Sequence, residues 1–212
     1  MKVSGGIIEF EQDTIIQDTI NYSPTILAFI ILALSRHKDK LDIIDFGGSL
    51  ATNYFQNRKV LQHLEQTQFT WNVIERPVLA KLGREHLSNA NLHFFSSLRE
   101  AMNSSNGASD CFLFSGSLQY VAEPLVVLDE VIGLGAKLVA LDRLLVSPED
   151  GPQVFIQHPN PEMHYPATYP VWCFSKKAFI RNLVSKGFTL VDNFTHNPNA
   201  HFDHCGMIFV SR

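Results

Sequence analysis

Five short apolar runs recur over the first two thirds of the chain, and each ends in polar, charged or small residues. The runs cover residues 41–45, 71–75, 92–97, 111–117 and 137–143. The stretches between them are long enough for helices, so the pattern predicts repeated βα units with parallel strands. The carboxyl ends of parallel strands meet at one edge of the sheet. We therefore expect a ligand site at that edge.

Turn and capping residues place the helices. Ser23 and Pro24 predict the start of a helix that runs to about residue 37. Further helices are expected over residues 52–68, 76–88, 119–134 and 175–186. Two more apolar runs, at residues 188–191 and 207–210, predict a terminal antiparallel hairpin.

The first strand runs into Asp45, which is followed by Phe46, Gly47 and Gly48. Glycines leave no Cβ in the way, so a ligand can lie against this backbone, and Asp45 is expected to face the crevice. Glu75 ends the second strand, where an acid can accept both hydroxyls of a ribose. A tight turn without a ligand remains the alternative for the two glycines taken alone.

In its motif order the chain resembles the class I methyltransferases that use S-adenosylmethionine. The motifs are Ile-Ile-Asp-Phe-Gly-Gly-Ser, Val-Ile-Glu, Phe-Phe-Ser-Ser-Leu, Phe-Ser-Gly-Ser-Leu-Gln-Tyr and Ala-Leu-Asp-Arg. More narrowly, the chain is similar to a methyltransferase family associated with bacterial surface-polysaccharide biosynthesis, and the likeness covers roughly residues 20–210. The resemblance implies an α/β, Rossmann-like class I methyltransferase fold. Its central, mostly parallel seven-stranded sheet would carry an antiparallel C-terminal hairpin and helices on both faces.

The resemblance also implies S-adenosylmethionine as cofactor and assigns its binding residues to the ends of the first four strands. These residues are Asp45, Gly47, Gly48, Ser49, Glu75, Arg76, Ser96, Ser97, Leu98, Ser115, Gly116 and Gln119. Two positions depart from the family pattern. Ala51 stands near the place of a third glycine, and Ser96-Ser97 replaces the usual acid after the third strand.

Residues 144–172 interrupt the βα pattern and are rich in proline and aromatic residues. Long connections in compact domains usually carry function, so we expect a lid or acceptor-pocket wall there. A surface loop pinned by its aromatic residues is the alternative. The single expected domain, 1–212, then comprises an N-terminal helical cap (1–40), a cofactor-binding core (41–143), the lid (144–172), and a C-terminal helix with the hairpin (173–212).

Methyl transfer depends mainly on alignment of donor and acceptor, although an oxygen or nitrogen acceptor also needs a base. The candidates for this base are His164, Tyr120 and Asp142. Arg143 could hold an anionic acceptor such as a phosphate or uronate. For each residue, a structural hydrogen bond or ion pair is the alternative role.

Composition and charge limit the classes of partner and cellular location that we expect for this protein. The 212 residues carry a net charge of −4 without a basic cluster, which argues against nucleic acid. The three cysteines fit neither a disulfide framework nor a zinc pattern, and we expect a cytoplasmic protein. The longest apolar run, residues 26–34, is too short to span a bilayer. No metal is expected, because in the group His201, Asp203 and His204 only the first two share a strand face.

The function expected from these observations is methyl transfer from S-adenosylmethionine to a small molecule or glycan precursor. A degenerate member that binds the cofactor, its product or nothing, and acts as a partner or regulator, is one alternative. A nicotinamide-dependent oxidoreductase is another, but it would need Gly-x-Gly-x-x-Gly after the first strand. The residues indicate neither the acceptor nor the oligomeric state.

Overall fold

The computed structural model describes residue 20 and residues 22–37, 39–63, 68–105, 109–158, 167–195 and 202–212. It also gives the backbone of four short strands near the N-terminus, which form two antiparallel pairs. These are β1 (Val3–Ser4) with β2 (Ile7–Ile8), and β3 (Phe10–Gln12) with β4 (Ile15–Gln17).

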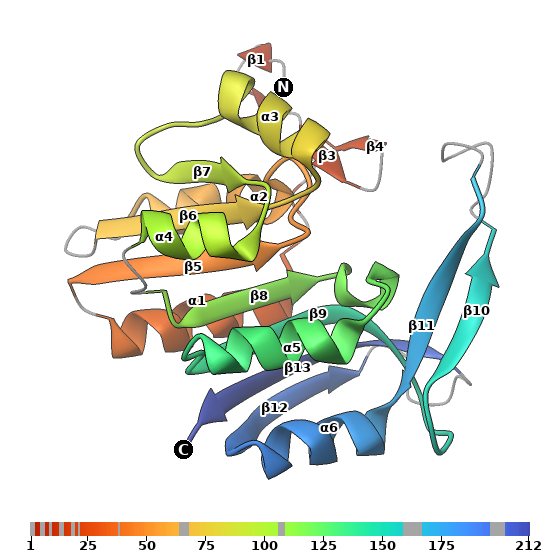
Figure 1. Ribbon diagram of the computed structural model, residues 1–212. Coiled ribbons are helices and arrows are strands. Elements are labelled where there is room, and N and C mark those ends of the chain that lie inside the picture. Colours follow the sequence, from red (N-terminus) through yellow and green to blue (C-terminus); the bar gives the residue numbers. More distant parts are fainter. Residues whose placement is uncertain are drawn as a thin grey trace.

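The centre of the molecule is a twisted sheet whose main strands run in the order β7-β6-β5-β8-β9-β13-β12 (Figure 1). They are β5 (Lys40–Phe46), β6 (Gln68–Ile74), β7 (Leu92–Phe95), β8 (Cys111–Ser115), β9 (Leu138–Ser147), β12 (Phe188–Thr195) and β13 (Asp203–Ser211). All are parallel except β13, which pairs antiparallel with both β12 and β9. The predicted mostly parallel sheet with an antiparallel C-terminal hairpin is confirmed.

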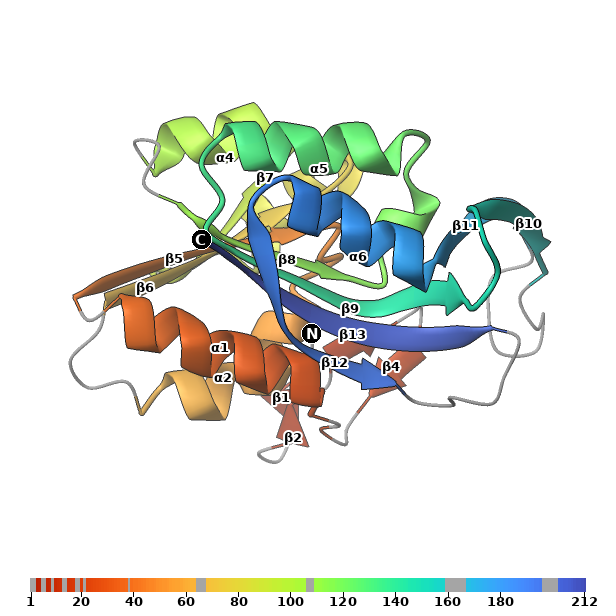
Figure 2. The ribbon, with the colours of Figure 1, turned by 90° about the horizontal axis from the view of Figure 1, so that it is seen from below.

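Helices cover both faces of this sheet, as predicted (Figure 2). The helices are α1 (Pro24–Arg36), α2 (Thr52–Leu61), α3 (Pro77–His86), α4 (Leu98–Ser104), α5 (Pro124–Gly133) and α6 (Lys176–Ser185). α1 and α2 lie on one face, whereas α4, α5 and α6 lie on the other. The start of α1 is the predicted one, since Pro24 is its first residue and Ser23 accepts a hydrogen bond from the Ile26 amide.

Some helix boundaries differ from those expected. α2 ends at Leu61, seven residues early, and the chain enters β6 at Gln68. Residues 119–134 are not one helix, because a short 3₁₀ turn, η1 (Leu118–Tyr120), precedes α5. Pro124 fixes the start of α5, since proline is well suited to the first turn of a helix but not to its interior.

Residues 144–172 contain regular strands, which the sequence did not predict for the expected lid segment. β9 continues through Ser147, and two strands follow, β10 (Gln153–Gln157) and β11 (Tyr169–Ser175). These strands pair antiparallel and form an arm that projects beyond the carboxyl edge of the sheet (Figure 1). Only residues 174 and 175 of β11 pair with β9, at residues 146 and 147. The sequence did not predict this hairpin, because one of the prolines, Pro170, lies inside β11.

Each face of the sheet has its own apolar core. Ile44, Phe112 and Phe209 belong to the core beneath α4, α5 and α6, whereas Trp71 and Leu113 belong to the core beneath α1 and α2. The three cysteines are buried and form no disulfide. Among the described residues, no helix is both long and apolar enough to cross a membrane.

Candidate active site

A cleft of about 1990 Å³ lies at the carboxyl ends of β5, β6, β7 and β8. The turns that follow these strands form one wall of the cleft, and the arm and the start of β13 form another. This is the edge of the sheet at which the sequence placed the ligand site.

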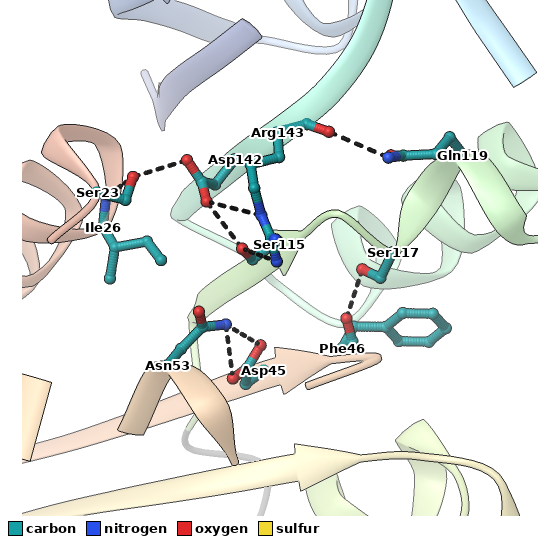
Figure 3. Close-up of polar contacts among 10 residues, drawn as sticks. All are labelled: Ser23, Ile26, Asp45, Phe46, Asn53, Ser115, Ser117, Gln119, Asp142 and Arg143. Atoms are coloured by element: carbon teal, nitrogen blue, oxygen red, sulfur yellow. Dashed lines mark hydrogen bonds and ion pairs between the residues drawn. The ribbon is translucent and has the colours of Figure 1, made fainter. Parts of the chain in front are cut away.

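The turn after β5 is in close contact with the turn after β8. Gly47 has a φ of +68°, and its amide donates to the Ile74 carbonyl at 2.8 Å. A Cβ at Gly47 would lie 2.5 Å from Cβ of Ser117, so both the conformation and the space require glycine. The Ser117 hydroxyl donates to the Phe46 carbonyl at 2.6 Å and ties the two turns together (Figure 3).

Asp45 does not face the cleft, which corrects the expectation for this residue. Its carboxylate is fully buried, where it accepts hydrogen bonds from Trp71 Nε1 at 3.0 Å and from Asn53 Nδ2 at 3.2 Å. A Cβ at Gly48 would lie 2.6 Å from Asp45 Oδ2, so this glycine makes room for the carboxylate. Burial raises the pKa of Asp45 to about 6, although the hydrogen bonds from Trp71 and Asn53 oppose this effect.

Ala51 stands near the place where the family pattern has a third glycine. Its φ is +66°, the left-handed conformation that favours glycine, and it stands just before α2. Its methyl group is fully buried in the core beneath α1 and α2, and Ala51 does not line the cleft. The substitution therefore strains the backbone without filling ligand space.

Glu75 lines the cleft at the end of β6, and its side chain is 12% exposed. Its Oε1 accepts the amide of Arg76 at 2.8 Å, and the Arg76 guanidinium Nε lies 3.5 Å from the same oxygen. The backbone of Glu75 is fixed as well, since its amide donates to the Phe95 carbonyl at 3.0 Å. A carboxylate is thus held at the position where the sequence predicted one.

Beyond β7, Ser96 and Ser97 take part in the cap of α4. The Ser97 hydroxyl accepts from the Glu100 amide at 3.2 Å, while the amide and hydroxyl of Ser96 each donate to Glu100 Oε2 at 2.8 Å. The hydrogen bonds from the Ser96 amide and from its hydroxyl lower the pKa of Glu100. Sequence reasoning missed this acid, although Ser97-Leu98-Arg99-Glu100 has the spacing of a capping box.

Arg143 lies within β9, one residue beyond the last pair of β9 with β8, and it reaches the cleft through a strained backbone. Its φ is +52°, and Gln119 Nε2 donates to its carbonyl at 3.1 Å. The guanidinium lies over Gly116, where a Cβ would come within 3.2 Å of Nη2. Nη2 donates to Ser115 Oγ at 3.4 Å, and Nε lies 3.7 Å from Asp142 Oδ2 (Figure 3).

Asp142 is the buried anchor of this arrangement, and it does not line the cleft. It accepts hydrogen bonds from Ser23 Oγ at 2.7 Å and from Ser115 Oγ at 2.8 Å (Figure 3). The start of α1 is thereby joined to the end of β8 and to the middle of β9. Ser115 is itself buried, and its hydroxyl serves this network.

The arm supplies an aromatic and polar wall. Tyr120 Oη donates to Gln157 Oε1 at 3.1 Å, and the rings of Tyr120 and Tyr169 meet edge to face with centroids 5.5 Å apart. Trp172 Nε1 donates to the carbonyl of Val121 at 3.0 Å, which fixes β11 to the loop after η1. Two parts of the chain distant in sequence therefore build this side of the cleft.

The structure brings most of the sequence-predicted site residues to the cleft. Those that line it are Gly47, Glu75, Arg76, Ser96, Ser97, Leu98, Gly116, Gln119, Tyr120 and Arg143. Asp45, Gly48, Ser49 and Ser115 do not line it, and His164 lies outside the described residues. The residues that sequence reasoning did not assign to a site include Ser117, Gln157 and Phe202.

The suggested metal group near the C-terminal hairpin is only partly described. His201 lies outside the described residues, whereas Asp203 and His204 line the cleft. A different group, His37, Asp110 and Cys111, lies at the opposite edge of the sheet, with ligand atoms within 4.8 Å of one another. Burial raises the pKa of the Cys111 thiol, which favours the protonated form that metals bind poorly.

No protein-family model and no curated protein sequence matches the chain. Solved structures do match it. The N-terminal domain of EvdMO1 with S-adenosylhomocysteine bound is 14% identical with a TM-score of 0.60, over 97% of this chain and 90% of that one. The glycopeptide N-methyltransferase MtfA complexed with S-adenosylmethionine is 10% identical with a TM-score of 0.57, over 90% and 96%.

A third structure is the Burkholderia thailandensis 1,6-didemethyltoxoflavin-N1-methyltransferase, with 1,6-didemethyltoxoflavin and S-adenosylhomocysteine bound. It is 14% identical with a TM-score of 0.51, over 89% of this chain and 78% of that one. At these identities the likeness establishes the fold alone. The chain has the Rossmann-like fold of the S-adenosylmethionine-dependent methyltransferases, as the sequence predicted.

Proposed function

We propose that this protein transfers a methyl group from S-adenosylmethionine to a small molecule or glycan precursor. The observation that carries the proposal is the cleft itself, in which the Gly47 turn and the Glu75 carboxylate line adjacent strand ends. The three solved structures compared above contain S-adenosylmethionine or its demethylated product, and two of them are named as methyltransferases.

The residues of the cleft fit this cofactor. Gly47 and the Gly116–Ser117 turn offer a close backbone approach for the amino-acid part of the cofactor. Glu75 offers a carboxylate for the ribose hydroxyls, and the segment 96–98 lies one strand further along, where the adenine would follow. Neither departure from the family pattern blocks this assignment. Ala51 lies outside the cleft, and Ser96 and Ser97 line it, where a serine hydroxyl or a backbone carbonyl could accept from the adenine amino group.

The cofactor would supply an electrophilic methyl group attached to a sulfonium. The protein then has to hold the acceptor in line with it and exclude water. Arg143 lines the cleft beside Gly116, and this position supports a role in binding an anionic group of the acceptor. Tyr120 and Tyr169 line the same cleft and would pack against the apolar part of the acceptor. Tyr120 and His164 remain our candidates for the base that an oxygen or nitrogen acceptor needs.

Calorimetry with S-adenosylhomocysteine tests the cofactor assignment. We expect E75Q to weaken binding by about 10- to 100-fold, because charge-assisted hydrogen bonds to the ribose are lost. E85Q on the exposed surface of α3 is the matched control and should bind like the wild type. Equal affinity of E75Q and the wild type would contradict the assignment of Glu75 to the ribose.

Transfer itself needs a second measurement. Incubation with labelled S-adenosylmethionine and a panel of sugars, uronates, sugar phosphates and aromatic amines should give a methylated product. Binding of the cofactor without transfer to any of them would favour the degenerate, non-catalytic alternative. Binding of a nicotinamide dinucleotide in place of the methyl donor would refute both readings.

A further inference from the structure

The outer strand of the arm, β10, is the last strand at its side of the sheet (Figure 1). Within the described residues it pairs only with β11, so its other edge offers backbone donors and acceptors to a further strand. Natural proteins usually protect such edges with charges, prolines or bulges. The sequence of β10, Gln-Val-Phe-Ile-Gln, contains no charge and no proline.

Two β-branched side chains of β10 are more than half exposed. Val154 is 52% exposed and Ile156 is 58% exposed, and alternate residues of a strand share one face. Phe155 points to the other face, where its ring meets Phe202 with centroids 4.9 Å apart. The exposed pair thus forms a small apolar surface directly beside an open backbone edge.

The sequence of β10 is nearly a palindrome about Phe155. If two copies of this strand pair antiparallel about a two-fold axis at Phe155, Val154 faces Ile156 of the second copy and Gln153 faces Gln157. All four exposed β-branched side chains then gather on one face of the joined sheet, in cross-strand pairs that stabilise sheets. No like charges oppose each other. A two-fold contact of this kind is self-complementary and closes on itself.

We propose that β10 is a dimerisation edge, through which a second copy of this chain extends the sheet of the first. The contact is a five-residue strand pair with four apolar side chains, which places it among small, transient interfaces. We therefore expect a dimer that forms and dissociates with protein concentration. The same arm lines the cleft through Gln157 and Tyr169, so dimerisation would also restrain the wall of the site.

Sedimentation velocity over a range of protein concentrations is the first test. The wild type should show a concentration-dependent monomer–dimer equilibrium, and I156K should remain monomeric, since a lysine at the edge disfavours further pairing. V78K is the matched control, because Val78 on α3 is 71% exposed and lies outside the arm. This variant should dimerise like the wild type. A monomeric wild type, or a dimer that survives I156K, would overturn the proposal.

Disulfide trapping tests the register. In the two-fold pairing, residue 155 faces its own copy at a Cα separation of about 5 Å, within the range of a disulfide. F155C should therefore form a covalent dimer under mild oxidation, whereas V154C, which faces Ile156, should not. The native cysteines are buried and should not interfere. Equal trapping of both variants, or of neither, would refute this register. Circular dichroism checks that each variant is folded.

Discussion

The indole nitrogen of Trp71 lies 3.0 Å from Oδ2 of Asp45 and donates a hydrogen bond to a carboxylate that has no contact with solvent. Asn53 donates to the same group from α2. Burial nevertheless outweighs these bonds and raises the pKa of Asp45 from 3.8 to about 6. Asp45 therefore has a structural role beneath the turn that follows β5. Ionisation of its buried carboxyl group lowers the stability of the folded state.

This pKa predicts a pH dependence of stability. Between about pH 4 and pH 6 the folded state keeps a proton on Asp45 that the unfolded state has lost. The free energy of unfolding should therefore fall as the pH rises through this window and level off above it. The contribution is at most about 3 kcal/mol. Urea titrations at several pH values should show this slope in the wild type relative to D45N. Parallel curves for the two proteins would contradict the prediction.

Gly47 should be intolerant of any side chain. G47A adds a Cβ in a left-handed conformation and within 2.5 Å of Ser117 Cβ, so we expect a loss of about 2–3 kcal/mol in unfolding free energy. Removing the opposing Cβ with S117G relieves the clash but not the backbone strain. The double variant G47A/S117G should therefore be more stable than the sum of the two single effects by about 1 kcal/mol. Strict additivity in chemical denaturation would show that the two turns are not in contact.

Arg143 should act on the acceptor and not on the cofactor. R143Q removes a charge held over Gly116, so we expect KM for a uronate or sugar phosphate to rise about 10- to 100-fold. The affinity for S-adenosylhomocysteine should stay within about twofold, a change of under half a kcal/mol. Steady-state kinetics and calorimetry on the same preparation separate these effects, with R181Q on the surface of α6 as control. A large loss of cofactor affinity in R143Q would place the guanidinium on the carboxylate of the cofactor instead.

We expect the aromatic ring of Tyr169, and not its hydroxyl group, to support turnover. Y169A removes the edge-to-face partner of Tyr120, a contact worth about 0.5–1.5 kcal/mol beyond simple burial, so kcat/KM should fall while cofactor affinity is retained. Y169F keeps the ring and should behave like the wild type. The measurement is turnover together with S-adenosylhomocysteine affinity for both variants. A matched loss of both quantities in Y169A would mean that the arm shapes the cofactor site itself.

The sequence predicted well those features that depend on local pattern. The apolar runs before Glu75 and Ser115 are strands, and because parallel strands end at one edge, most of the expected site residues reached one cleft. The orientation of the Asp45 side chain was not predicted, because it depends on hydrogen bonds from Trp71 and Asn53 that form only in the folded chain. The approach of Arg143 to Gly116 depends in the same way on the pairing of β8 with β9.

The arm was missed for a related reason. Its two strands are separated by the segment 158–168, and Pro170 breaks the alternation that marks β11. Once paired, Pro170 faces Ile156 in an ordinary antiparallel register. Composition correctly marked this segment as the part of the chain that departs from the βα repeat, but only long-range pairing shows that it is a hairpin.

The attachment of the arm has a consequence for how such a protein can change. The arm joins β9 through two register positions, Phe174 with Val146 and Ser175 with Ser147, whereas the turns at Gly47 and Gly116 are tied into the middle of the sheet. One wall of the cleft is thus formed by a hairpin that makes little contribution to the pairing of the central sheet. Hairpins of other lengths and compositions could be exchanged at this junction and would present new surfaces to incoming molecules while the sheet stays intact. Binding specificity could then change through this one segment, and a hairpin swap at residues 148–173 is the direct way to test this in the laboratory.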